Sequence, residues 1–305
     1  MPGRTWYFVA DLHGRIDRYD KLFDRVAAER PSVLLLGGDL LPHGLQGPSG
    51  AAGRTPEGPA EGAPSAPGRD ADDFVARVLV SGFRDLRRRL GSSAPRVGLI
   101  LGNDDPRAEE PPILQAGDVG LWAYLHGRRV EWDRFVVHGY ACVPPTPFAL
   151  KDWERYDVSR YVDPGCVAPE DGWHSVPFDE RAIRHATILD ELGRLVAADD
   201  QARAVWLLHA PPYDTPLDRA ALDGRSVEHV PLDVHVGSIA VRRLIEARQP
   251  WLTLHGHVHE SARLTGAWKT RLGRTWCLSA AHDGPELALV RLDPEVPGDA
   301  ERLLL

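Results

Sequence analysis

Five apolar runs of this 305-residue chain each end in residues that can bind a divalent metal ion. The runs stop at "DLH", "GGD", "GND", a single histidine and "GHVH". Carboxylate, imidazole and amide oxygen form a mixed nitrogen and oxygen donor set, which suits Mn, Fe or Zn. The candidate ligands are Asp11, His13, Asp39, Asn103, His209, His257 and His259.

The spacing of these residues indicates that they share one site. Asp11 and His13 are two residues apart, and so are His257 and His259, so each pair projects to one side of an extended segment. In an open α/β sheet, ligands bind beyond the carboxyl ends of the strands. If the five strands are neighbours, we expect all their ends to face one crevice.

The elements that must position these residues follow an α/β pattern of short apolar runs and longer amphipathic stretches. The apolar runs predict strands at 5–10, 32–38, 96–102, 204–210 and 251–257, part of a hairpin at 131–143, and closing strands at 274–280 and 286–292. The amphipathic stretches predict helices at 16–30, 71–90, 179–198 and 237–248. No internal repeat or shift in composition divides the chain, so we expect one domain over residues 1–305.

Two irregular stretches interrupt this pattern. Residues 42–70 are rich in Pro, Gly, Ala and Ser, which predicts a flexible surface insertion without a chemical role. Residues 144–177 form an aromatic loop that could serve as a lid or a substrate platform. Trp153 and Tyr156 could stack a planar group, and Lys151 or Arg155 could meet a phosphate. The alternative is a long loop that packs onto its own domain.

The ordered motifs resemble those of the calcineurin-like metallophosphoesterases, and they span residues 11–259. The resemblance implies a four-layer αββα sandwich with a central pair of mixed β-sheets. It also implies a hydrolase of phosphoester bonds with two divalent metal ions, for which Mn, Fe and Zn are all open.

The resemblance also implies a role for each candidate ligand. Asp11, His13 and His259 would hold one metal, and Asn103, His209 and His257 would hold the other. Asp39 would bridge the two ions, because a carboxylate has two oxygens. A hydroxide shared between the metals would attack phosphorus.

One position departs from the family pattern. Members often have histidine directly after the asparagine of the third motif, where it can protonate the leaving group, but this chain has Asp104. Aspartic acid can donate a proton at neutral pH only if its pKa is raised. We therefore hypothesise that the substrate is a phosphodiester, small or nucleotide-like, with Asp104 as a candidate catalytic residue. A phosphomonoesterase or protein phosphatase is the alternative, and a non-catalytic interaction module on the same fold is the alternative of another class.

Three residues are candidates for binding substrate. Arg15 could clamp a phosphate oxygen, as guanidinium groups do, although a surface arginine at a helix start is the simpler interpretation. His282 follows a strand and could line the same crevice, and Asn103 could contact substrate as well as metal. We expect His255 to be a core histidine and His43 a solvated loop residue.

Composition indicates the kind of partner and the cellular compartment of the protein. The net charge of -8 argues against a nucleic-acid partner. No apolar run reaches the roughly 18 residues that cross a bilayer, and the first strand begins too early to leave room for a secretory signal. The three cysteines lie far apart, which favours a reducing compartment, so we expect a cytoplasmic protein. The natural substrate, the metal pair and the oligomeric state stay open.

Overall fold

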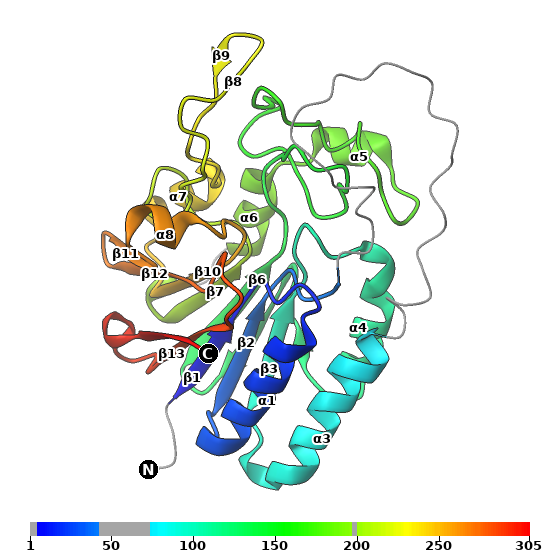
Figure 1. Cartoon of the computed structure of the whole chain (residues 1–305), viewed down its shortest axis with the longest axis vertical. Coiled ribbons are helices and arrows are strands. Elements are labelled where there is room, and N and C mark those ends of the chain that lie inside the picture. Colours follow the sequence, from blue (N-terminus) through cyan, green and yellow to red (C-terminus); the bar gives the residue numbers. More distant parts are fainter. Residues whose placement is uncertain (1–4, 43–73, 197–199) are drawn as a thin grey trace.

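Two mixed β-sheets packed face to face form the centre of the molecule, with helices on both outer faces (Figure 1). The computed structural model describes residues 5–42, 74–196 and 200–305. The two sheets meet where β2 (Val33–Gly37) contacts β7 (Ala204–Leu208) and where β3 (Arg96–Ile100) contacts β6 (Phe135–Tyr140). This arrangement is the four-layer αββα sandwich expected from the sequence.

The first sheet has the strand order β14-β13-β1-β2-β3-β4. Its four strands β1 to β4 are parallel, and β13 and β14 add an antiparallel edge. The strands not yet bounded are β1 (Trp6–Val9), β4 (Ala123–Tyr124), β13 (Ala288–Leu292) and β14 (Glu301–Leu304). Every residue of β1 and β2 is buried, as continuous apolar strands covered on both faces should be.

The second sheet repeats this plan with the order β11-β12-β10-β7-β6-β5. Its four central strands are parallel, while β5 and β11 are antiparallel edges. The further strands are β5 (Arg128–Trp132), β10 (Leu252–His255), β11 (Lys269–Leu272) and β12 (Thr275–Ser279). A separate two-stranded hairpin joins β8 (Ser226–Val227) to β9 (Val230–Pro231).

The helices cover the two sheets from outside (Figure 1). On the first sheet, α1 (Ile16–Glu29) packs against α3 (Ser81–Leu90), and α4 (Glu110–Asp118) contacts β4. On the second, α6 (Ile188–Val196) packs against α7 (Ile239–Arg248). Two short helices, α5 (Glu180–His185) and α8 (Ser261–Thr265), lie in connections. In the part of the chain that the structure describes, no helix has the length and hydropathy to cross a membrane.

The strands predicted from the sequence are confirmed, but the helices needed two corrections. The single helix predicted at 179–198 is wrong, because α5 ends at His185 and α6 begins at Ile188. Between them Thr187 pairs with Tyr156 as an isolated β-bridge, and its hydroxyl accepts from the backbone N–H of Asp190. The helix predicted at 71–90 has π-helical turns over Val75–Val80 before α3. Sequence reasoning did not find α4, α8, β4, β11, β14 or the β8–β9 hairpin.

The aromatic loop packs onto its own domain. Lys151 is fully buried and pairs with Glu154 at 2.6 Å, so the prediction that Lys151 meets a phosphate is wrong. Trp153 and Tyr156 are also buried, which rules out the predicted stacking of a planar ligand. The indole N–H of Trp153 donates to the backbone carbonyl of Asp105 at 2.8 Å. The loop thereby fastens onto the segment that follows β3. Of the predicted insertion at 42–70, residues 43–70, and with them His43, lie outside the described residues.

Candidate metal centre

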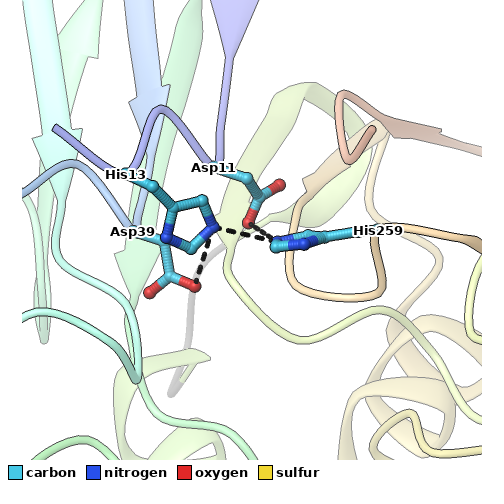
Figure 2. A group of neighbouring side chains, drawn as sticks. All are labelled: Asp11, His13, Asp39 and His259. Atoms are coloured by element: carbon cyan, nitrogen blue, oxygen red, sulfur yellow. Dashed lines mark hydrogen bonds and ion pairs between the residues drawn. The ribbon is translucent and has the colours of Figure 1, made fainter. Parts of the chain in front are cut away.

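The metal-binding candidates gather at one edge of the sandwich, where strands of both sheets end. Figure 2 shows Asp11, His13 and Asp39, which follow strands of the first sheet, facing His259, which follows β10 of the second. Each of these four residues offers one ligand atom, and the four atoms lie within 4.8 Å of one another. The strand ends of the two sheets therefore bring these side chains together, as the sequence indicated.

The distances in this first group suit a single ion. Nε2 of His13 lies 3.0 Å from Nε2 of His259 and 3.9 Å from Oδ2 of Asp39. Nε2 of His259 lies 3.5 Å from Oδ1 of Asp11. The other Asp11 oxygen, Oδ2, is buried and has no hydrogen-bond partner in the described residues. A buried carboxylate oxygen without a donor is what a cation at this point would satisfy.

A second group adjoins the first and shares Asp39 with it. Nε2 of His209 lies 3.2 Å from Oδ2 of Asp39 and 3.1 Å from Oδ1 of Asn103. The ring of His257 lies beside that of His209, with 5.2 Å between the ring centres. The same Asp39 oxygen thus faces His13 on one side and His209 on the other.

Backbone contacts set the orientation of His209. Its Nδ1 lies 2.8 Å from the carbonyl oxygen of Gly37, which can only accept, so Nδ1 carries a proton. In the neutral ring the lone pair is then on Nε2, the atom that faces Asp39 and Asn103. The strand end of β2 therefore fixes the tautomer that a metal ligand needs.

The backbone at the centre adopts a conformation that residues other than glycine rarely accept. Asp11, His13, Asp39 and His257 have φ angles of 57°, 47°, 52° and 76°. Such left-handed geometry is costly for single residues and concentrates at functional sites. It is held by hydrogen bonds from the N–H of Asp11 to Gly38 and from the N–H of His13 to Asp39, at 3.0 and 2.8 Å. These bonds thus join the segment 11–13 to the segment 38–39.

Neighbouring atoms lie too close to residue 102 for any side chain, so glycine is required there. A Cβ atom at this position would lie 2.7 Å from Nε2 of His209 and closer still to Oδ1 of Asp39. Both contacts are far inside van der Waals distance. Any side chain here would therefore displace two of the metal-binding candidates, Asp39 and His209.

The comparison with protein families decides the identity. Residues 5–261 match the model of the calcineurin-like phosphoesterases. The chain belongs to this family. Its members are hydrolases of phosphoester bonds and use a binuclear centre of divalent metals. The resemblance inferred from the motifs is confirmed.

Solved structures resemble the chain over almost its whole length, at low sequence identity. TT1561 of Thermus thermophilus shares the fold; it is 15% identical, with a TM-score of 0.55 over 99% of each chain. An archaeal phosphodiesterase is 9% identical, with a TM-score of 0.46 over 99% of each chain. A dimetal phosphatase from Danio rerio is 13% identical, with a TM-score of 0.49 over 94% of this chain and 92% of that one. A comparison with curated proteins finds no match.

Burial and neighbouring charges shift the pKa values of the groups at the phosphoesterase centre. Burial raises the pKa of Asp11, but the hydrogen bond and charge of His259 outweigh it and hold the pKa below its usual range. For His209 burial lowers the pKa, yet the charge of Asp39 outweighs burial and raises it to about 10. Burial and the charge of His209 lower the pKa of His257 to about 4. The ionised carboxylates of Asp11 and Asp39 therefore lie beside His209, which holds a proton that a cation can replace, and beside His257, whose ring is neutral.

Asp105 is a positioning residue that sequence reasoning missed. Its buried carboxylate accepts hydrogen bonds from the backbone N–H groups of Leu40, Leu41 and Gly102 at 2.8 to 3.1 Å. Burial and then the charge of Asp39 raise the pKa of Asp105 to about 7, although these hydrogen bonds act in the opposite direction. Asp105 ties the loop of Asp39 to the loop of Asn103. The only signal in the sequence is an acidic residue in the tight turn after "GND".

Arg18 is a second residue that the sequence did not reveal as part of the site. From α1 its guanidinium donates to the carbonyl oxygens of Asp11 at 2.6 Å and Gly284 at 2.7 Å. It is buried beside Tyr19 and Leu22 on the helix face that points inward. An arginine on the apolar face of a helix was the available signal.

Asp104 touches the centre through two contacts. Its backbone N–H donates to Oδ1 of Asp39 at 2.9 Å. Its carboxylate oxygen Oδ2 lies 3.4 Å from Nδ1 of His13, and its side chain is about one-third exposed. Asp104 therefore contacts Nδ1 of His13, whereas Nε2 of the same ring faces Asp39.

The remaining candidates lie apart from this cluster. Arg15 is exposed and pairs with Asp17 at 3.2 Å, and His282 lies 3.0 Å from Glu286, so substrate binding by either stays a prediction. His255 is buried, with Nδ1 next to the carbonyl of Ala210 and Nε2 next to the hydroxyl of Thr253. As expected, His255 is a core histidine.

Proposed function

We propose that this chain is a binuclear phosphodiesterase whose two ions share Asp39. One ion is assigned to Asp11, His13 and His259, and the other to Asn103, His209 and His257. The observation that supports this most is the position of Asp39 Oδ2, 3.9 Å from Nε2 of His13 and 3.2 Å from Nε2 of His209. Manganese, iron and zinc all suit such a donor set.

Two divalent ions held there would supply Lewis-acid stabilisation of the phosphoryl oxygens and an activated water. The side chains prepare the site for them. The N–H of Asp104 donates to Oδ1 of Asp39, while Oδ2 faces His13 and His209. The carbonyl of Gly37 keeps the lone pair of His209 on Nε2. Asp105 holds the loops of Asp39 and Asn103 in register.

The preference for a diester follows from Asp104. An alkyl leaving group of a monoester needs a proton, whereas an activated diester needs less help. The carboxylate of Asp104 lies 3.4 Å from Nδ1 of His13, and its side chain is about one-third exposed. An ionised carboxylate can only accept a hydrogen bond, so it has no proton for a leaving group.

Replacing Asp104 by histidine tests this preference. We expect Asp104→His to raise the ratio of glycerol-phosphate hydrolysis to bis-nitrophenyl-phosphate hydrolysis at least about tenfold, since a general acid contributes roughly 10²–10⁴ where it is needed. Asp104→Asn removes the same charge without adding an acid and should leave the ratio where it was. An unchanged ratio in Asp104→His would refute the diester preference.

Metal uptake should depend on pH. In the metal-free protein the pKa of His209 is about 10, so below that pH the ring holds a proton that an ion must displace. The affinity for Mn²⁺ should therefore rise with pH, by up to about tenfold per unit between pH 6 and 8. Calorimetry in buffers of different ionisation enthalpy measures both the affinity and the protons released. An affinity that is flat over this range, with no proton release, would contradict the assignment of His209.

We also propose one domain and a cytoplasmic location. A single cluster of buried apolar residues runs through both sheets and their helices. All three cysteines fall in the described residues, and each is a free thiol, which suits a reducing compartment. The net charge of -8 favours a small substrate over a nucleic acid.

A further inference from the structure

Two neighbouring cavities lie beside the aromatic loop, outside the set of metal-binding candidates. Their volumes are about 410 and 270 Å³. Arg107 and Arg155 line both of them, so the cavities adjoin at these two guanidinium groups. The polar lining of the larger one also includes Arg194, His126, Tyr140 and Glu191.

The two shared arginines are held in place before any ligand arrives. Nη1 of Arg155 donates to the carbonyl of Glu154 at 2.6 Å. The guanidinium of Arg107 lies over the ring of Trp153, 5.0 Å from its centre, and its Nε donates to Glu110 at 3.1 Å. Side chains fixed in this way lose little entropy when they bind a ligand.

The larger cavity has an excess of positive charge. Three arginines line it against one carboxylate, Glu191. That carboxylate already accepts a hydrogen bond from Tyr140 at 2.5 Å and lies 3.7 Å from Nε of Arg155. Glu191 therefore fixes Arg155 and Tyr140, and Glu110, outside this lining, pairs with Arg107 at 3.1 Å. Arg194 adds a further positive charge to the lining. An anionic group would complete the site.

His126 adds a neutral donor to this lining. Its Nδ1 accepts from the backbone N–H of Ala141 at 3.0 Å, so the ring proton is on Nε2. Burial, with help from nearby arginines, lowers the pKa of His126 to about 3 and keeps the ring neutral. The rings of His126 and Tyr140, tilted by 32° with 5.5 Å between their centres, also line the cavity.

We propose that this cavity binds the phosphate group of a small organic phosphate through Arg107, Arg155 and Arg194. Guanidinium forks match phosphate oxygens in geometry and charge, and the volume lies in the range of small-molecule sites. The site is distinct from the metal centre, but the two are joined. Trp153, which stacks beneath Arg107, donates to the carbonyl of Asp105, and Asp105 holds the loops of Asp39 and Asn103.

The test uses chelator-treated protein, so that phosphate cannot bind to metal ions. Phenyl phosphate is titrated into the whole chain by calorimetry, and one binding site is expected. Arg107→Gln and Arg194→Gln should each weaken binding about tenfold, the effect of losing one charge-assisted contact. Arg88→Gln is the matched control, because Arg88 lies on α3 with a side chain that is 77% exposed; its affinity should equal that of the unsubstituted chain.

Two outcomes would overturn the proposal: no binding of phenyl phosphate to the metal-free chain at millimolar concentration, or equal affinity in Arg194→Gln and Arg88→Gln. Unfolding temperatures of the variants guard against a folding defect. If Arg107→Gln unfolds, Arg194→Gln decides, because Arg194 is exposed on α6. This test is independent of the diester preference, because the binding measurement requires neither bound metal nor hydrolysis.

Discussion

Asp39→Ala should lower kcat/KM for bis-nitrophenyl phosphate by more than about a thousandfold, because a bound metal contributes several kcal/mol and each 1.36 kcal/mol is a factor of ten. Asp39 is the one side chain that lies in both groups, with its Oδ2 facing His13 and His209. Its loss should weaken both metal positions at once. Steady-state hydrolysis with Mn²⁺ supplied measures the effect.

A matched control separates this loss from general damage. His185→Ala changes an exposed residue of α5 and should leave the rate unchanged. Circular dichroism of both variants should match that of the unsubstituted chain. Activity of Asp39→Ala within about tenfold of the unsubstituted chain would show that the shared carboxylate is not needed.

Asp105→Ala should be the most destabilising single substitution near the centre. It leaves the buried N–H groups of Leu40, Leu41 and Gly102 without their acceptor. Each unpaired buried donor costs about 1–3 kcal/mol, so we expect a loss of about 4 kcal/mol in the free energy of unfolding. In a chain of this size that corresponds to a fall of about 6 °C in Tm. Thermal unfolding with chelator present measures it in the absence of metal.

The adjacent residue provides the comparison. The side chain of Asp104 is about one-third exposed, and the backbone N–H groups that donate to Asp105 do not donate to it. Asp104→Ala should therefore shift Tm by no more than about 2 °C. Equal shifts in the two variants would mean that the hydrogen bonds of Asp105 do not brace the two loops. A large fall in Asp105→Ala alone would support its positioning role.

The metal-binding candidates could be found from the sequence because their positions follow from the sheets. Each comes after an apolar run, and parallel strands bring their carboxyl ends to one edge. The runs before Asp11 and Asp39 are fully buried strands, as their composition indicated. The left-handed backbone conformation of these residues could not be predicted from the sequence. It depends on hydrogen bonds between loops that lie far apart in the chain.

The aromatic loop could not be predicted because its contacts are all tertiary. Lys151, Trp153 and Tyr156 looked available for substrate, yet each is buried. Lys151 forms an ion pair with Glu154, and the indole N–H of Trp153 donates to a backbone carbonyl in the loop after β3. No local pattern specifies these partners. The break between α5 and α6 has the same origin, since Thr187 pairs with Tyr156 of this loop.

Asp105 and Arg18 were missed for a related reason. Both bind backbone groups, and the sequence carries no mark of which carbonyl or N–H a side chain will reach. Asp105 joins the loops after β2 and β3, and Arg18 joins the loop after β1 to Gly284. The candidate ligands can be identified from motifs, whereas the residues that hold these candidates in place require the fold.

The number of Mn²⁺ ions bound per chain tests the two-ion centre most directly. We expect about two ions in the unsubstituted protein, and about one each in His259→Ala and His257→Ala, because the two histidines are assigned to different ions. His185→Ala should bind as many as the unsubstituted chain. Less than one ion per chain in the unsubstituted protein, or the same number in all four proteins, would contradict a centre of two ions held by these side chains.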